Sequence, residues 1–219
     1  MENYYSTYRE EIIPFIPVDC KTLLDVGCSE GNFAQSIKKH NQAEVWGIEK
    51  NQSCAHQAEQ KIDCVLCGDI QSLIPKIPDQ HFDCITFNDV LEHLISPDYV
   101  LQQMKKKLTT RGIIVCSIPN ILNISILKNL IFHRDWEYAS NGILDKTHLR
   151  FFTQKSMRRM FQDLGFDAQI TGINPTRSLK FKLFNCLTLF RFQETAFIQF
   201  VSLLRIKTWE GKLTFPLDL

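Results

Sequence analysis

The chain has 219 residues, 44% of them hydrophobic, which fits one domain, or one domain with an insertion, around a sizeable core. Its formal net charge of +1 gives no overall field that would attract nucleic acid or an anionic membrane. No uncharged apolar run approaches the roughly 20 residues that span a bilayer. We therefore expect one domain over residues 1–219 and no nucleic-acid partner, and the oligomeric state stays open.

Eight cysteines are scattered through apolar segments, and the start of the chain lacks the pattern of a secretory signal peptide. This usage favours a reduced, cytoplasmic setting. Cys64 and Cys67 form a CxxC, but they fall in a predicted strand, where residues three apart face opposite sides. We therefore expect neither a redox motif nor a bound metal.

Apolar strand patterns alternate with amphipathic helix patterns along the chain. A short helix is expected at 8–16, ended by Pro17. Strands are predicted at 21–27, 44–49, 62–67, 82–88, 112–118, 166–173 and 197–207, and helices at 32–40, 52–61, after Ser96, and from Thr153 to 164. This alternation predicts an α/β fold with a doubly wound parallel sheet between two helical layers.

The helix predicted after Ser96 is amphipathic, with one apolar face. Ser96 is placed as its N-cap and Pro97 at its first position. Four apolar residues share one side of this helix, namely Val100, Leu101, Met104 and Leu108. The three lysines at 105–107 are expected to form its solvated side.

The segment LLDVGCSEGNFA, residues 23–34, is the most informative stretch. It joins an apolar strand to a glycine turn and a helix N-terminus, an arrangement that suits a nucleotide-like ligand. Gly27 and Gly31 let the backbone approach the ligand where a side chain would collide. Asp25 turns a carboxylate toward the ligand, which favours a cationic amino-acid end over a pyrophosphate. A plain strand-to-helix turn is the alternative.

This run resembles motif I of the class I S-adenosylmethionine (SAM)-dependent methyltransferases, with Ser29 where a middle glycine often falls. The resemblance implies SAM as the cofactor, S-adenosylhomocysteine (SAH) as its product, and cofactor contacts from Asp25, Gly27, Cys28 and Gly31. It also implies a Rossmann-like, mostly parallel seven-stranded sheet, in which the antiparallel last strand inserts between the fifth and the sixth.

Two acids follow the next strands. Glu49 ends the second strand, where a carboxylate accepts hydrogen bonds from the hydroxyls of a ribose; an acid near a helix N-terminus is the alternative. Asp69 follows the third strand and is expected to contact an adenine amino group, with Ile70 packed on the ring. A surface-loop aspartate is the alternative there.

The run FDCITFNDVLEHL, residues 82–94, ends the central fourth strand, where open α/β sheets bind ligands. It resembles motif IV of a methyltransferase subgroup that includes the ubiquinone and menaquinone enzymes. The resemblance implies that Asn88 and Asp89 border the methionine part of SAM and that Val90 covers it. His93, just inside a short helix, is expected to be structural rather than catalytic.

Residues 119–152 interrupt the alternation and are expected to form a substrate-binding lid. Asp145 and His148 are three apart, so one helical turn would put a carboxylate beside an imidazole and raise its basicity. Arg150 offers a planar fork for carboxylate or phosphate. We predict catalytic or substrate-binding roles for Asp145, His148 and Arg150; an Asp145–Arg150 ion pair that merely shapes the lid, or a capped helix turn, is the alternative.

The segment GILDKTHLRFFT, residues 142–153, resembles one in methyltransferases encoded with sugar-polymer and glycosyl-transfer enzymes. That resemblance implies a saccharide or another small hydroxyl compound as acceptor, and O-methylation by direct displacement. The saccharide acceptor and O-methylation rest on this resemblance alone.

The segment 177–192, RSLKFKLFNCLTLFRF, places basic residues among Leu and Phe. It suits a basic amphipathic helix lying on a membrane surface, and a helix covering the sheet is the preferred alternative. An apolar acceptor, as in a quinone-type or lipid methyltransferase, would suit the same segment. A non-catalytic SAM-binding protein and an NAD-dependent oxidoreductase are the remaining rivals, and the second is disfavoured because GCSEG lacks the GxGxxG spacing.

Overall fold

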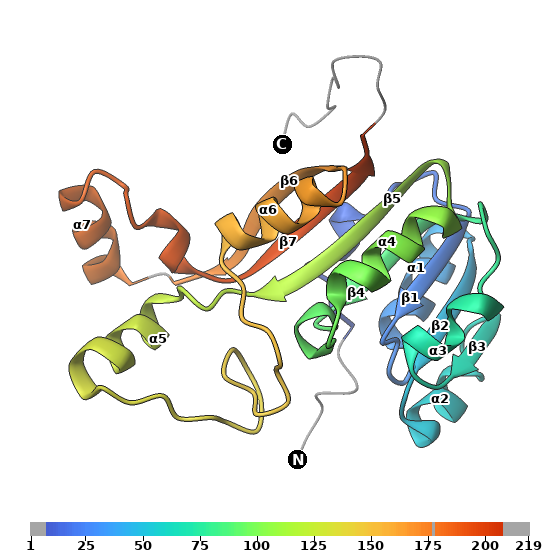
Figure 1. The fold of residues 1–219 in the computed structure, drawn as a ribbon, viewed down its shortest axis with the longest axis horizontal. Coiled ribbons are helices and arrows are strands. Elements are labelled where there is room, and N and C mark those ends of the chain that lie inside the picture. The colour runs from blue at the N-terminus through green and yellow to red at the C-terminus, as the bar shows by residue number, and fades with distance from the viewer. Residues whose placement is uncertain (1–7, 177, 208–219) are drawn as a thin grey trace.

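A computed structural model describes residues 8–176 and 178–207, and it is built around one seven-stranded sheet in the order β3-β2-β1-β4-β5-β7-β6 (Figure 1). All neighbouring strands are parallel except β7, which runs antiparallel to both β5 and β6. The predicted α/β architecture and the insertion of an antiparallel last strand are therefore confirmed.

The strands lie close to their predicted positions. They are β1 (Thr22–Val26), β2 (Glu44–Glu49), β3 (Cys64–Cys67), β4 (Phe82–Asn88), β5 (Leu108–Pro119), β6 (Phe166–Pro175) and β7 (Phe197–Ile206). The helices are α1 (Asn32–Asn41), α2 (Gln52–Ala58), α3 (Ile70–Leu73), α4 (Pro97–Lys107), α5 (Ile124–Lys128), α6 (Gln154–Asp163) and α7 (Leu179–Leu187), with shorter turns η1 (Ile13–Phe15), η2 (Ile74–Lys76), η3 (Leu91–His93), η4 (Asn129–His133) and η5 (Gln193–Ala196).

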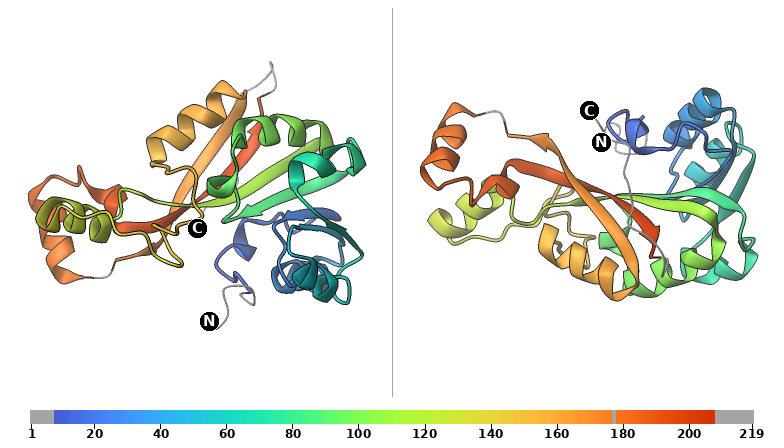
Figure 2. Two further views of the ribbon diagram at one scale, coloured as in Figure 1. Left: turned by 60° about the horizontal axis from the view of Figure 1, so that its bottom comes forward. Right: turned by 90° about the horizontal axis from the view of Figure 1, so that it is seen from above.

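Helices cover both faces of the sheet and bury a core on each (Figure 2). On one face, α3, α4 and α6 contribute apolar residues such as Leu101, Met104 and Phe161, each fully buried. On the other face, α1 and the N-terminal segment contribute Ile12 and Ile37. The central strands, covered on both sides, are therefore apolar along their length, as expected of a parallel sheet.

Capping and packing explain two of the helices. Thr153 and Ser156 form a capping box at the start of α6, as the predicted Thr153 cap requires. In α4 the predicted apolar face is buried, but Lys107 is buried as well, at 7% exposure. Its ammonium group donates to the Ile77 carbonyl oxygen at 2.7 Å and to Asp79 at 2.6 Å. The expectation that all three lysines are solvated is therefore wrong for Lys107, because a turn before β4 supplies partners that periodicity does not reveal.

Other differences have simple causes. The helix expected at 8–16 is only the short turn η1, because Pro14 and Pro17 leave too few amide donors for further turns. The short helices α3 and α5 were not predicted, since one turn carries little periodicity. The helix α7 does not lie on the sheet: it lies with α5 at one end of the molecule, beyond β6 and β7 (Figures 1 and 2).

All eight cysteines are free in the structure. Within the described residues, none of the helices has the length and apolar character that a bilayer crossing requires.

Candidate functional site

The turn after β1 lies at the carboxyl end of the parallel sheet and adopts a conformation that requires glycine. Gly27 and Gly31 have φ angles of +78° and +76°, in the region that residues with a Cβ rarely occupy. A Cβ on Gly27 would lie 2.5 Å from Val90 Cγ2, and one on Gly31 would lie 3.1 Å from Ala58 of α2. Gly27 is therefore needed at the ligand side of the turn, and Gly31 for the packing of the turn against α2.

Glu49 ties the end of β2 to this turn. Its carboxylate accepts hydrogen bonds from the Ser29 amide at 2.8 Å and from the Asn51 amide at 2.7 Å. One oxygen accepts each bond, so both oxygens keep capacity for a ligand hydroxyl. Glu49 is half-buried and lines two cavities, which fits both the predicted ribose contact and the structural alternative.

The two cavities meet at the carboxyl ends of β1, β2 and β4. The larger, of about 740 Å³, and the smaller, of about 430 Å³, lie in the size range of ligand sites. They share five lining residues at the centre of the site, which are Gly27, Glu49, Asp89, Val90 and His93.

The smaller cavity has a polar end formed by β1 and β4. Asp25 is 2% exposed and accepts a hydrogen bond from the Thr86 hydroxyl at 2.7 Å. Burial raises the pKa of Asp25 to about 7. Asn88 lies at the same end, and its side-chain oxygen is buried with no partner among the described residues. Such an orphaned acceptor and a buried carboxyl group fit the ammonium group of an amino-acid ligand.

The larger cavity has the predicted adenine residues on its wall. Asp69 caps α3 by accepting a hydrogen bond from the Gln71 amide at 2.9 Å, and Ile70 is 5% exposed. Both line this cavity together with Val90. The adenine contacts stay a prediction, and Asp69 also has a structural partner in α3.

The turn after β4 contains Asp89, whose φ angle is +54° and which lines both cavities. Its carboxylate forms an ion pair with Arg9 and accepts a hydrogen bond from Gln199 at 2.6 Å. Arg9 also donates to the Ser117 hydroxyl at 2.8 Å. The N-terminal segment and β7 therefore close the site. No local sequence pattern predicted Arg9 or Gln199 as site residues.

The insertion reaches the rim of the larger cavity. Ser140, Asn141, Asp145, Lys146, Thr147 and Leu149 line it. Two amides fasten the base of the insertion to η3, because Leu149 and Arg150 both donate to the Glu92 carbonyl oxygen, at 2.9 and 3.0 Å. The insertion thus forms the outer wall of the larger cavity.

The three predicted catalytic residues have different surroundings. The Asp145 carboxylate accepts hydrogen bonds from the Thr147 amide and hydroxyl, which lower its pKa against the opposing effect of burial. The Arg150 guanidinium donates to the Ile95 carbonyl oxygen at 2.6 Å. Within the described part of the chain, Asp145 and Arg150 form no ion pair, and Arg150 lines none of these cavities.

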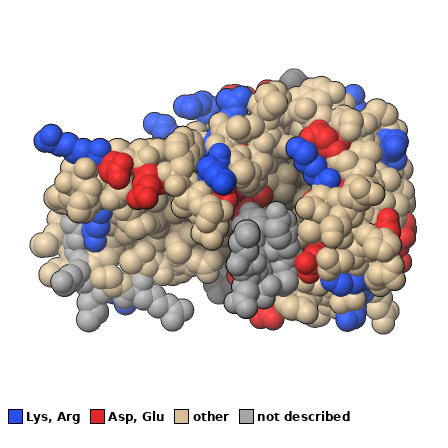
Figure 3. All heavy atoms as spheres, turned by 90° about the horizontal axis from the view of Figure 1, so that it is seen from below, with Lys and Arg blue, Asp and Glu red and all other residues tan. Residues whose placement is uncertain are grey.

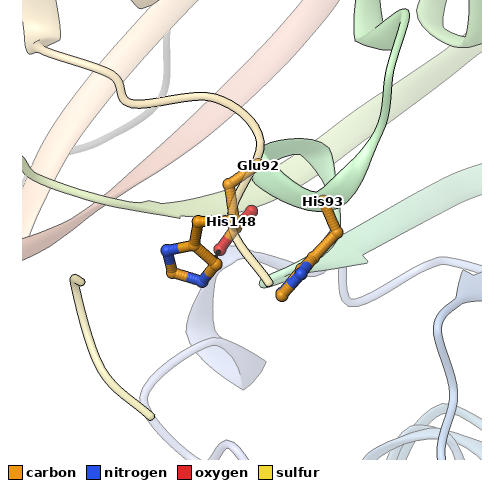
Figure 4. A group of neighbouring side chains, drawn as sticks. All are labelled: Glu92, His93 and His148. Atoms are coloured by element: carbon orange, nitrogen blue, oxygen red, sulfur yellow. Dashed lines mark ion pairs between the residues drawn. The ribbon is translucent and has the colours of Figure 1, made fainter. Parts of the chain in front are cut away.

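The acid that faces the His148 ring is Glu92, not Asp145. Glu92 is 1% exposed, His148 is 8% exposed, and Glu92 Oε1 lies 4.0 Å from His148 Nε2. The His93 ring packs edge-to-face on His148 with 4.7 Å between ring centres (Figure 4). Burial raises the pKa of Glu92 well above its usual range, and burial and the neighbouring His148 lower the pKa of His93. One signal was available in the sequence, since LEHL places an acid inside an apolar run.

Comparison with known proteins decides the family. A family model described as a methyltransferase domain matches residues 2–169, most of the chain. The chain belongs to this family. A curated relative, an uncharacterised methyltransferase of Schizosaccharomyces pombe, is 27% identical over 118 residues. That match covers 48% of this chain and 42% of the relative, so the chain spans less than half of that protein.

Solved structures share the methyltransferase fold. A SAM-dependent methyltransferase from Archaeoglobus fulgidus has a TM-score of 0.69 at 19% identity, covering 89% of this chain and 90% of that one. One from Mesorhizobium loti has a TM-score of 0.64 at 15% identity, covering 89% and 96%. The plantazolicin methyltransferase BamL, solved with SAH, has a TM-score of 0.60 at 14% identity, covering 84% and 76%.

The family model agrees with the predicted methyltransferase class, and the solved structures agree with the predicted fold. They do not extend to the sugar-polymer or quinone subgroup, which stays a prediction. In BamL the product SAH is bound, and the walls of the present site fit the same molecule: a glycine turn with no room for a Cβ, an acid at the end of β2 and an orphaned acceptor on Asn88.

Proposed function

We propose that this methyltransferase transfers the methyl group of SAM to a hydroxyl group of a small-molecule or saccharide acceptor. The observation that carries the proposal is the shape of the site. A cavity whose inner wall comes from β1, β2 and β4 has an outer wall from the insertion, including Ser140, Asp145 and Thr147. One wall is available for a nucleoside and the other for an acceptor with polar groups.

The larger cavity would hold the adenosine part of SAM, and the polar end of the smaller cavity would hold its methionine part. Glu49, Asp69 and Ile70 would contact the adenosine part, and Asp25 and Asn88 the amino group of the methionine part. Gly27 would let the turn approach the cofactor closely. When bound, SAM supplies a sulfonium methyl group whose leaving group is already activated, so the protein mainly aligns the acceptor oxygen.

The acceptor hydroxyl would lie beside the cluster of Glu92, His93 and His148. His148 Nδ1 lies 3.0 Å from the Ile143 carbonyl oxygen, which only accepts hydrogen bonds, so Nδ1 carries the hydrogen and Nε2 keeps a lone pair. This tautomer supports the predicted proton-accepting role of His148. Arg150, bonded to Ile95 at the outside, would act on an acceptor only if its side chain moved.

A panel of hydroxyl acceptors, including mono- and oligosaccharides, tests the proposal with methyl-labelled SAM and mass spectrometry. We expect one labelled methyl ether and one SAH per turnover. Calorimetry with SAM and with NADH separates the rivals: binding of NADH but not SAM would contradict the proposal. SAM binding with no labelled product from hydroxyl, amine or quinone acceptors would favour a non-catalytic SAM-binding protein.

One feature favours a second candidate, a lipid or quinone-type acceptor presented at a membrane surface. Large apolar side chains are exposed at the end of the molecule formed by α5, η4 and α7, namely Leu130, Ile131, Phe132, Leu183, Leu187, Leu189 and Phe190. Lys128, Arg134, Lys182 and Arg191 are exposed among them. On the face drawn in Figure 3 the corresponding left-hand part is mainly tan, with Lys or Arg and Asp or Glu side chains at separate points on it. Apolar and basic side chains together suit an anionic lipid surface.

Vesicle sedimentation tests this candidate. We expect the protein to sediment with phosphatidylglycerol-containing vesicles and a double variant, Ile131→Ser with Phe132→Ser, to lose most of that binding. Val18→Ser is the matched control, because Val18 is 85% exposed in a different part of the chain. Equal sedimentation of the double variant and the wild type, or none with either, would contradict the membrane contact.

A further inference from the structure

The cluster formed by Glu92, His93 and His148 joins two parts of the chain. Glu92 and His93 come from the short turn η3 after β4, and His148 comes from the insertion. Their side chains point into the same small space (Figure 4), and one donor atom of each lies within 4.8 Å of the others. The predicted lid therefore contributes directly to a group of metal-ligating side chains at the inner end of the site.

The Glu92 carboxyl group lacks the partners that a buried acid needs. It is 1% exposed, and neither oxygen has a hydrogen-bond partner among the described residues. The 4.0 Å between Oε1 and His148 Nε2 is too long for a hydrogen bond. Buried polar groups are almost always paired, so this carboxyl group calls for a ligand that the chain itself does not supply.

Both histidines are held with a free nitrogen. His148 Nδ1 donates to the Ile143 carbonyl oxygen at 3.0 Å. His93 Nδ1 lies 3.2 Å from both the carbonyl and the hydroxyl oxygen of Thr147. Because the Thr147 hydroxyl donates its hydrogen to Asp145 at 2.7 Å, His93 Nδ1 is the donor to Thr147. A hydrogen on each Nδ1 leaves a lone pair on each Nε2. Backbone carbonyls that fix the outer nitrogen of a histidine are the usual support of a metal-ligating imidazole.

We propose that Glu92, His93 and His148 bind a divalent transition-metal cation, with zinc as the representative ion. Two nitrogens and one carboxylate oxygen suit such an ion better than magnesium or calcium, which prefer oxygen ligands. Bonds of about 2.0–2.2 Å allow two ligands of one ion to lie at most about 4.2 Å apart. The Glu92–His148 pair already meets this limit, and the widest separation of 4.8 Å requires only a small side-chain rotation. This differs from the expectation of no bound metal.

The site is placed to act on the acceptor, a step that rests on the proposed function. A cavity of about 130 Å³ borders the cluster and is lined by Glu92 and His148 together with Asp89 and Gly142. Three protein ligands leave a coordination position open toward a hydroxyl group there. Coordination lowers the pKa of that hydroxyl, and its proton passes to solvent water. The alkoxide oxygen then bonds to the methyl carbon of SAM as the carbon–sulfur bond breaks, and its electron pair stays on sulfur to give neutral SAH.

Cobalt titration of the EDTA-treated protein tests the site directly. We expect one Co²⁺ per chain, with visible absorption of a nitrogen- and oxygen-ligated ion, and displacement by Zn²⁺. Glu92→Gln and His148→Ala should each weaken binding at least about 100-fold. His56→Ala is the matched control, because His56 is an exposed histidine paired with Glu59 and should leave the titration unchanged. Circular dichroism confirms that each variant is folded. If either Glu92→Gln or His148→Ala fails to fold, the titration uses His93→Ala and His148→Gln instead.

The outcomes separate this proposal from the proposed function. Stoichiometric binding that is lost in Glu92→Gln supports the site even if no acceptor is methylated. Absence of binding, or equal binding in His148→Ala, overturns it. Full methylation in EDTA that is lost in His148→Ala also overturns it, because His148 would then act as a proton acceptor without a metal.

Discussion

Gly27 and Val90 approach each other so closely that no side chain fits between the turn after β1 and the turn after β4. A Cβ on Gly27 would lie 2.5 Å from Val90 Cγ2. Since φ at Gly27 is +78°, any substitution is strained as well. We expect Gly27→Val to abolish SAM binding measured by calorimetry.

A folded Gly27→Val protein with unchanged SAM affinity would contradict this placement of the cofactor. A second pair of variants separates collision from misfolding. Gly27→Ala should lower the melting temperature, and adding Val90→Ala should restore part of it by removing the contact. SAM affinity should stay low in the double variant if the glycine is needed for the ligand.

Glu49 is expected to hold the ribose of SAM. Glu49→Gln should weaken SAM binding by about 1.5–3 kcal/mol, or roughly 10–150-fold, the range for hydrogen bonds to charged groups. Because Glu49 also accepts hydrogen bonds from the Ser29 and Asn51 amides, the melting temperature must be measured with the affinity. Glu44→Gln, at the exposed start of β2, is the control. An unaltered affinity with a sharp fall in melting temperature would make Glu49 purely structural.

The buried acid Asp25 predicts a pH dependence. Its pKa is raised from 3.8 to about 7, mainly by burial; Glu49 adds to the rise, whereas the Thr86 hydroxyl and Arg9 oppose it. Between these two pH values the unfolded chain has lost the proton that the folded chain keeps, so stability falls as pH rises through this window. SAM, with its ammonium group, should bind the ionised form, and its affinity should rise up to about tenfold per pH unit below pH 7.

Calorimetry between pH 5 and 8 checks this dependence. Asp25→Asn should flatten the pH profile, lower the affinity at pH 8 and remove the loss of stability on raising the pH. If the variant kept the slope of the wild type, another group would be responsible and Asp25 would not face the cofactor's ammonium group.

The insertion should exchange hydrogen unevenly. The amides of Leu149 and Arg150 donate to the Glu92 carbonyl oxygen, so the base of the lid should be protected in the free protein. Residues 140–143 at its tip are mainly exposed and should exchange rapidly. Bound acceptor should then slow exchange from Asn141 to His148. Strong protection of the tip without acceptor would mean a fixed insertion rather than a lid.

The three lid variants should differ in kinetics. His148→Ala should lower turnover by about 10²–10⁴-fold, whether His148 accepts a proton or binds a metal. Arg150→Ala should raise the acceptor's Michaelis constant if the guanidinium binds the acceptor. Because Asp145 is bonded to Thr147 rather than to Arg150, Asp145→Asn should behave differently from Arg150→Ala. Equal, modest defects in Asp145→Asn and Arg150→Ala with wild-type turnover in His148→Ala would remove all of these roles.

Local patterns predicted the sheet well because each strand is a continuous apolar run bounded by turns. The bounds of β2 and β4 match the expectation, and the Thr153 cap of α6 is in place. The common location of the glycine turn, Glu49, Asp69 and Asn88 was predictable because parallel strands bring their carboxyl ends to one edge of the sheet.

Contacts between residues far apart in the chain could not be predicted from the sequence. Arg9 reaches Asp89 across eighty positions, and Glu92 meets His148 across the insertion. Three-residue spacing suggested that Asp145 would orient His148, but the segment turns tightly and its carboxylate bonds to Thr147 instead. Only the path of the folded chain reveals such partners, and the buried carboxyl group of Glu92 becomes informative only once its surroundings are known.

Transfer of a labelled methyl group from SAM to a hydroxyl acceptor is the decisive measurement for this protein. Wild-type protein, SAM with a labelled methyl group and the hydroxyl-acceptor panel are incubated with and without Zn²⁺, alongside Gly27→Val, and the products are identified by mass spectrometry. We expect a labelled methyl ether and an equal amount of SAH from the wild type, and neither from Gly27→Val. Failure of the wild type to bind SAM, or label appearing only on nitrogen or carbon, would contradict it.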